Sequence, residues 1–257
     1  MNILVVNPNS SVAMTEGMLK AIQSLDLPES IKIKTYTAPS DSPASIDNGE
    51  DIRKSAEVAL ADLTRSGELE KYDGILVACY SVHTLVDKLA RQLGSRVAVT
   101  GIFEASILAA AALLPHTSTG PPESQWGIVT TGEFWEKHLS DGVRGFLGEP
   151  EGAAQNLKFR GVVSTGLTAG DFHHVSPEEV RAKLVKATEK LLGDGGVGVV
   201  AMGCGGMAGL EEIIRETAVA RYGAAKGGDI LVVDGVKAGV LQLEQMIRSK
   251  KAFQGRS

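Results

Sequence analysis

The stretch Val199-Val200-Ala201-Met202-Gly203-Cys204-Gly205-Gly206-Met207-Ala208 joins a short apolar run to a cysteine that lies among glycines. A β-branched apolar run of this length is typical of a buried strand, and glycines after it let a backbone approach a ligand closely. The only other cysteine of the chain, Cys79, follows a similar run, Gly74-Ile75-Leu76-Val77-Ala78. The sequence therefore predicts two thiols at the C-terminal ends of two buried strands.

Length, composition and charge limit the classes of protein to which the chain can belong. It has 257 residues, of which 43% are hydrophobic, and its net charge is -5 at pH 7. This length allows one large α/β domain or two similar lobes. Lysine and arginine are scattered rather than clustered, which excludes a basic surface for nucleic acid or an anionic membrane. The longest apolar run, residues 105–114, is shorter than the roughly 20 residues of a membrane span.

The two cysteines and the N-terminal residues also bear on location. Two cysteines make no disulfide framework, and Met1–Val6 reads as a strand rather than as a secretory signal. We therefore expect a cytoplasmic protein with both thiols reduced.

Strand and helix patterns alternate along the chain, and they do so twice in the same order. In each half a first strand ends in a polar turn, at Asn9-Ser10 in one half and at Thr131 in the other. The cysteine follows that turn by about 70 residues in both halves, and Gly101–Ala105 corresponds to Gly235–Ala238. Alternating strands and helices predict parallel sheets, right-handed crossovers and ligand sites at the carboxyl ends of the strands.

We therefore predict an α/β fold of two pseudo-symmetric lobes, each a parallel sheet flanked by helices. Residues 1–116 form the N-terminal lobe with Cys79, residues 125–257 form the C-terminal lobe with Cys204, and the linker lies near residues 117–124. In this arrangement the active site lies in the cleft between the lobes, where the two cysteines face each other.

Two facing thiols suit the inversion of a carbon centre without a cofactor. One group removes a proton from one face of the carbon and the other delivers a proton to the opposite face, so one group must be ionised and the other neutral. Free cysteine titrates near pH ~8.5, and a helix N-terminus or a nearby cation lowers that value. Backbone N–H groups among the glycines would stabilise the oxygen of a forming enolate.

Several segments spread over nearly the whole chain resemble those of the aspartate/glutamate/hydantoin racemase superfamily, in particular its hydantoin and allantoin racemases and their fungal branch. These segments are Asn7–Ser10, Pro43–Asp47, Cys79–His83, Gly101–Ala105, Gly203–Met207 and Val233–Ala238. Tyr80–His83 departs from the Phe or Gly and the small acidic segment that follow the first cysteine in many hydantoin racemases.

The resemblance implies that Cys79 and Cys204 are the acid/base catalysts of a cofactor-independent racemase. Its substrate would be a 5-substituted hydantoin, with allantoin the leading candidate, inverted at C5. The resemblance also implies a homo-oligomer, and a substrate bordered by Asn9, Ser10, Ser45, Ile46, Tyr80, Ser81, Val82, Thr131, Gly203, Gly205 and Gly206.

Four features allow more than one interpretation. His83 lies one turn after Cys79 if a helix begins at the strand tip, and would then lower the pKa of the thiol; it is equally well a surface or helix-cap residue. Glu104 either contacts the substrate or supplies favourable charge at a helix start. The adjacent His173-His174 pair lacks metal-ligand spacing, so we expect no metal. Gly203-x-Gly205-x-x-Ala208 is a poor dinucleotide fingerprint, so we expect no nucleotide.

Two other functions remain open at this stage. Within the superfamily, the same thiols serve other enolate chemistry, such as decarboxylation or the cis–trans isomerisation of a small diacid of the maleate type. From another class, the chain could be a non-catalytic small-molecule-binding or redox-sensing protein. A catalytic thiolate alkylates at neutral pH and is protected by substrate, whereas packed thiols are inert.

Overall fold

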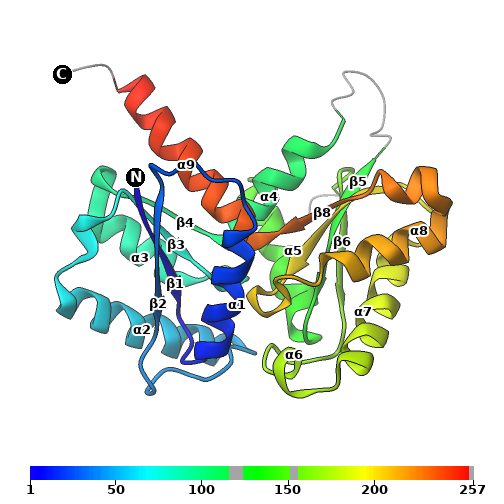
Figure 1. Ribbon diagram of the computed structural model, residues 1–257, viewed down its shortest axis with the longest axis horizontal. Coiled ribbons are helices and arrows are strands. Elements are labelled where there is room, and N and C mark those ends of the chain that lie inside the picture. Colours follow the sequence, from blue (N-terminus) through cyan, green and yellow to red (C-terminus); the bar gives the residue numbers. More distant parts are fainter. Residues whose placement is uncertain (116–123, 151–155, 255–257) are drawn as a thin grey trace. The chain divides into compact units, whose positions relative to one another are not determined.

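The computed structural model describes residues 1–115, 124–150 and 156–254, in which strands and helices alternate (Figure 1). They form two compact units. The first consists of Met1–Ala105 together with Val236–Ser257, and the second of Ser106–Gly235. In the described part of the chain, no helix is both long enough and apolar enough to cross a membrane.

The first unit contains a four-stranded sheet, parallel throughout, in the order β2-β1-β3-β4. Its strands are β1 (Asn2–Asn7), β2 (Lys32–Thr37), β3 (Gly74–Val77) and β4 (Ala98–Gly101). The apolar run of β3 is buried at every position, as expected of a central parallel strand covered on both faces, whereas the Ile-Lys alternation of β2 lies at one edge. All four strands end at the same edge of the sheet.

The other elements of the first unit are helices and short 3₁₀ turns. They are α1 (Val12–Gln23), α2 (Gly49–Ser66), η1 (Leu69–Lys71), α3 (Thr84–Leu93), η2 (Gly94–Arg96), the start of α4 (Ile102–Leu113) and α9 (Gly235–Phe253). Ser11 caps α1, as the turn-forming cluster before that helix predicts, by accepting a hydrogen bond from the backbone N–H of Met14. One face of β1 and β3 packs with α2 and α3 in a continuous apolar core.

The second unit contains a four-stranded parallel sheet in the order β6-β5-β7-β8. Its strands are β5 (Gln125–Thr130), β6 (Phe159–Ser164), β7 (Val197–Gly203) and β8 (Leu231–Asp234). Its other elements are α5 (Phe134–Phe146), α6 (Asp171–His174), α7 (Pro177–Leu192), η3 (Gly205–Met207) and α8 (Glu211–Gly228).

The two sheets share one topology, because in each the second strand in sequence lies outside the first, and the third and fourth follow on the other side. The predicted α/β class, with two parallel sheets flanked by helices, is therefore confirmed. Helix α8 starts at Glu211, after η3, and continues across Gly223, whose φ of 79° is available to glycine at little cost.

The compact units divide the chain differently from the predicted lobes of residues 1–116 and 125–257. Helix α9 belongs to the first unit, where Gly239 lies against the side chain of Leu76 on β3. Gly74, on the same strand, leaves room for Leu243 and Ile247 of α9. Apolar packing on a distant strand, rather than position in sequence, therefore assigns this helix to its unit. Residues 117–123 of the predicted linker lie outside the described residues.

Candidate active site

Cys79 lies in the loop that follows β3, two residues beyond Val77, and its side chain is half-buried. Its Sγ atom is 3.4 Å from the hydroxyl oxygen of Ser81. The backbone N–H of Ser81 donates to the carbonyl of Cys79 at 3.0 Å, which closes a tight turn. The loop thus presents the thiol and the hydroxyl together at the carboxyl edge of the first sheet.

Cys204 follows β7 directly and caps η3, where its Sγ atom accepts a hydrogen bond from the backbone N–H of Gly206 at 3.3 Å. The strand end before it is closely packed. A Cβ atom at Gly203 would lie 2.7 Å from Ile128 and 2.8 Å from Thr130, closer than real Cβ atoms come. Thr130 also donates its hydroxyl to the carbonyl of Gly203 at 2.8 Å. Position 203 therefore requires glycine, because any side chain there would displace the turn that carries Cys204.

Neither cysteine forms a disulfide, and both are half-buried. Cys79 and Cys204 occupy corresponding places, because each follows the third strand of a sheet with the same strand order.

His83 is the N-cap of α3, which begins at Thr84 and not at the strand tip. Its Nδ1 atom accepts from the backbone N–H of Leu85 at 3.3 Å, so the proton of the neutral ring is assigned to Nε2, which lies 3.1 Å from the Ser55 hydroxyl. Ser55 in turn donates to the carbonyl of Ile52 at 3.0 Å. This geometry fits the helix-cap interpretation of His83.

The same residue does not fit the role of a cation beside Cys79. Burial, and secondarily the charge of Lys88, lower the pKa of His83 from 6.5 to about 4. The imidazole is therefore neutral near pH 7, and its contribution is to hold the start of α3 and with it one end of the Cys79 loop.

The loop after β1 is tied together by its own side chains. Asn9 is buried, its Oδ1 atom accepts from the Asn7 side chain at 2.8 Å and from the Ser11 N–H at 2.9 Å, and its Nδ2 atom donates to the sulfur of Met14. Asn7, which is not among the residues expected to border the substrate, is fully buried at the centre of this network. The amide of Asn9 is thus committed to shaping the loop.

The loop between β2 and α2 is fastened to the loop after β1. The N–H of Ser10 donates to the carbonyl of Pro43 at 3.0 Å, and its hydroxyl donates to the carbonyl of Ser42. This brings Ser45 and Ile46 to the same end of the first unit as Ser10. Ile46 is buried, and the Ser45 hydroxyl oxygen is buried without a hydrogen-bond partner among the residues that the structure describes.

Tyr80 and Val82 flank the Ser81 position but differ in environment. The Tyr80 ring is buried and packs edge-to-face on Phe103, with ring centroids 5.6 Å apart. Val82 is 45% exposed. The contact between Tyr80 and Phe103 joins the loop after β3 to the start of α4.

Glu104 lies in the first turn of α4. Burial raises the pKa of its carboxyl group from 4.5 to about 7, although the backbone N–H groups of Glu104 and Gly101 oppose that rise. The backbone hydrogen bonds place the side chain at the start of its own helix, whereas burial disfavours its charged form. Only the tertiary packing reveals this raised pKa.

In the second unit, Thr131 is buried directly after β5, and its carbonyl accepts hydrogen bonds from the Thr165 hydroxyl and the Gly166 N–H. Thr130 pairs in register with Gly203, so Thr131 and Cys204 leave adjacent strands at the same edge of the sheet. Gly205 is buried and Gly206 half-buried in η3. The structure thus groups the predicted residues of this unit around one strand edge.

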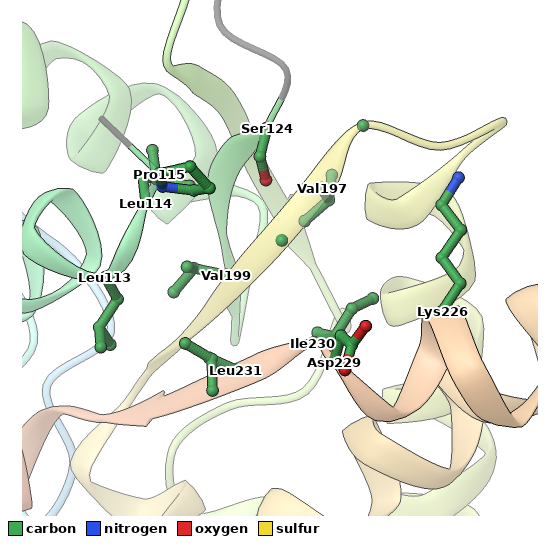
Figure 2. A pocket seen from close by; sticks show the side chains of 12 residues that line it. Leu113, Leu114, Pro115, Ser124, Val197, Val199, Lys226, Asp229, Ile230 and Leu231 are labelled. Atoms are coloured by element: carbon green, nitrogen blue, oxygen red, sulfur yellow. The ribbon is translucent and has the colours of Figure 1, made fainter. Parts of the chain in front are cut away.

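A cavity of about 310 Å³ lies elsewhere in the second unit (Figure 2). It is lined by the end of α4, the start of β7, the end of α8 and the start of β8, and Val199 and Leu231 contribute side chains from neighbouring strands. This is the amino end of β7, about 20 Å along the strand from its carboxyl end, where Cys204 lies. Among the described residues, no group of three or more His, Cys, Asp and Glu side chains is arranged to hold a metal ion.

Comparison with known proteins shows which family has this arrangement. The family model described as Asp/Glu/Hydantoin racemase matches residues 3–243. An uncharacterized protein of Schizosaccharomyces pombe is 31% identical over 246 residues, covering 96% of this chain and 92% of that protein. A hydantoin racemase of Rhizobium meliloti is 24% identical, covering 96% and 89% of the two chains.

Among solved structures, the allantoin racemase from Klebsiella pneumoniae superimposes with a TM-score of 0.76 at 24% identity, covering 97% of this chain and 88% of that chain. The likeness extends over both sheets, since nearly the whole chain is covered. Because the family model spans all the strands and both cysteines, the chain belongs to the Asp/Glu/hydantoin racemase family and is an isomerase of the racemase type.

Proposed function

We propose that this racemase inverts the C5 stereocentre of a 5-substituted hydantoin, with allantoin as the leading substrate, and that it needs no cofactor. One observation carries the proposal: two sheets of identical strand order each present one thiol just after the third strand. The similarity to a hydantoin racemase and to an allantoin racemase supports this class of substrate.

In the proposed reaction the two thiols act on the same carbon from opposite faces. The thiolate of one cysteine removes the C5 proton and becomes a thiol, and the electron pair of the broken C–H bond passes into the ring carbonyl as an enolate. The thiol of the other cysteine then gives its proton to the opposite face of C5 and becomes a thiolate. No net charge or proton is gained or lost, but the enzyme finishes with its proton on the other sulfur.

The Ser45 hydroxyl supports substrate binding in this scheme. A buried hydroxyl that lacks a partner is costly to the folded protein, so such groups are usually satisfied by a ligand or by water. A hydantoin ring offers both N–H donors and carbonyl acceptors, and a serine hydroxyl can pair with either. Because Ser10 fastens this loop to the loop after β1, the hydroxyl is held in place before substrate arrives.

The test follows optical rotation on a panel of single-enantiomer hydantoins that includes allantoin. We expect racemisation in both directions by the wild-type protein. The Cys79→Ser and Cys204→Ser variants should lose racemisation, because a serine hydroxyl is a far weaker acid than a thiol.

Proton exchange in D₂O shows on which face of C5 each cysteine acts. Each single variant retains one thiolate, which can remove the C5 proton and return a deuteron to the same face. We expect C–H to C–D exchange with retained configuration, on opposite enantiomers in the two variants. Exchange of the same enantiomer by both variants, or racemisation by either at a near wild-type rate, would contradict the proposal.

The proposed chemistry also sets the conditions under which the protein works. Both thiols must stay reduced, so we propose that it functions in the cytoplasm. The expected homo-oligomer stays a prediction, which light scattering coupled to size-exclusion chromatography tests.

A further inference from the structure

We infer that Ser81 is a positioning residue that sets the acidity of Cys79, rather than a residue that binds the substrate. The inference rests on the proposed two-thiol function. Its physical basis is the 3.4 Å contact between the Ser81 hydroxyl and the Cys79 sulfur.

The burial of Ser81, together with the contact that its hydroxyl already makes, argues against direct contact with a ligand. Its exposed fraction is 1%, whereas the neighbouring Cys79 is half-buried and keeps accessible surface. Unlike the buried Ser45 hydroxyl, which has no hydrogen-bond partner among the described residues, the Ser81 hydroxyl already has a neighbour on which to act. The neighbour that its hydroxyl meets is the sulfur of Cys79.

The turn that carries Ser81 is held on both sides, so the contact does not depend on a mobile side chain alone. The N–H of Ser81 donates to the carbonyl of Cys79, and two residues later His83 caps α3 through Leu85. The His83 ring is itself anchored by Ser55 of α2. Groups fixed in this way before reaction keep their full effect on the charge that develops.

A hydroxyl suits a sulfur that changes its protonation state in each turnover. When Cys79 is a thiolate, the Ser81 O–H donates to it; when Cys79 is a thiol, the serine oxygen accepts from S–H. The backbone N–H of Gly206 at Cys204 can only donate. The hydroxyl at Cys79 can be removed by changing a side chain, whereas the Gly206 N–H at Cys204 belongs to the backbone.

The experiment measures the alkylation rate of each cysteine by iodoacetamide as a function of pH. In the Cys204→Ser background only Cys79 reacts, and adding Ser81→Ala should raise the midpoint of its pH profile by about one unit and slow alkylation at pH 7 about tenfold. Ser81→Thr keeps the hydroxyl and should restore the original profile. The matched control is Ser81→Ala in the Cys79→Ser background, where the profile of Cys204 should not move.

Two outcomes would overturn the inference: an unchanged Cys79 profile in Ser81→Ala, or equal shifts at both cysteines. A kinetic readout separates positioning from binding. In otherwise wild-type protein, Ser81→Ala should lower kcat at pH 7 and regain it at higher pH with KM unchanged, whereas a binding role would raise KM at every pH. The alkylation assay needs no substrate, so a wrong substrate proposal and a wrong role for Ser81 give different results.

Discussion

Replacing Glu104 with Gln should remove a large part of the pH dependence of this protein's stability. Burial raises the pKa of Glu104 from 4.5 to about 7, and the nearby Asp87 carboxylate adds to the rise, while the backbone N–H groups of Glu104 and Gly101 act against it. Its Oε2 atom is buried without a hydrogen-bond partner in the described part of the chain. The ionised carboxylate is therefore the form that the folded protein disfavours.

The size of the change in folding free energy follows from the pKa shift of Glu104. One pKa unit corresponds to about 1.4 kcal/mol, so a rise from 4.5 to about 7 costs roughly 3 kcal/mol of folding free energy once the group is fully ionised. Because the pKa of this carboxyl group is raised on folding, the contribution of Glu104 to stability is most favourable below pH 4.5. It declines as the pH rises through about 7 and is level above that.

Gln at position 104 does not titrate, and as the third residue of α4 it still offers an oxygen to the helix start. The free energy of unfolding of Glu104→Gln, relative to wild type, should therefore increase by roughly 2–3 kcal/mol between pH 5 and pH 8. Urea unfolding followed by circular dichroism at the two pH values measures this difference. The titration of His83 affects both proteins equally and cancels.

Glu104→Ala provides the matched control. It removes the same titration and also the capping oxygen, so it should show the same change between pH 5 and pH 8 from a starting point about 1 kcal/mol lower. If the stability of Glu104→Gln changes with pH in parallel with that of wild type, burial does not raise the pKa of Glu104, and the reasoning fails.

Other perturbations test the packing and the site. Acid should destabilise the fold as the pH falls from about 6.5 through about 4, because burial lowers the pKa of His83 to about 4. His83→Asn replaces the capping ring nitrogen with a capping oxygen that does not titrate, and should remove that component of an acid titration followed by circular dichroism. Gly239→Ala should cost roughly 1–3 kcal/mol, since its Cβ would overlap Leu76, whereas Gly17→Ala, with open space around it, should add about 0.5–1 kcal/mol; thermal unfolding compares the two. Ser45→Ala should lower kcat/KM by the equivalent of roughly 0.5–1.5 kcal/mol in a racemisation assay, and unchanged kinetics would remove Ser45 from the site.

Local patterns in the sequence were sufficient for the fold class and for the position of both cysteines. The apolar run before Cys204 became β7, and the run before Cys79 became β3 with the thiol in the loop beyond it. Ser176 caps α7 by accepting from the N–H of Glu179, and the run Ser-Pro-Glu-Glu is typical of a helix start. These features depend on residues close in sequence, whose periodicity and hydrogen-bonding groups are read directly.

Tertiary structure alone decided what each residue meets. The neutral state of His83 depends on burial against α2, and the raised pKa of Glu104 depends on how deeply the start of α4 is buried. Helix α9 joined the first unit because its apolar side chains pack on β3, about 170 residues earlier in the chain. Desolvation and packing are properties of the whole set of surrounding atoms, and no short window of sequence contains them.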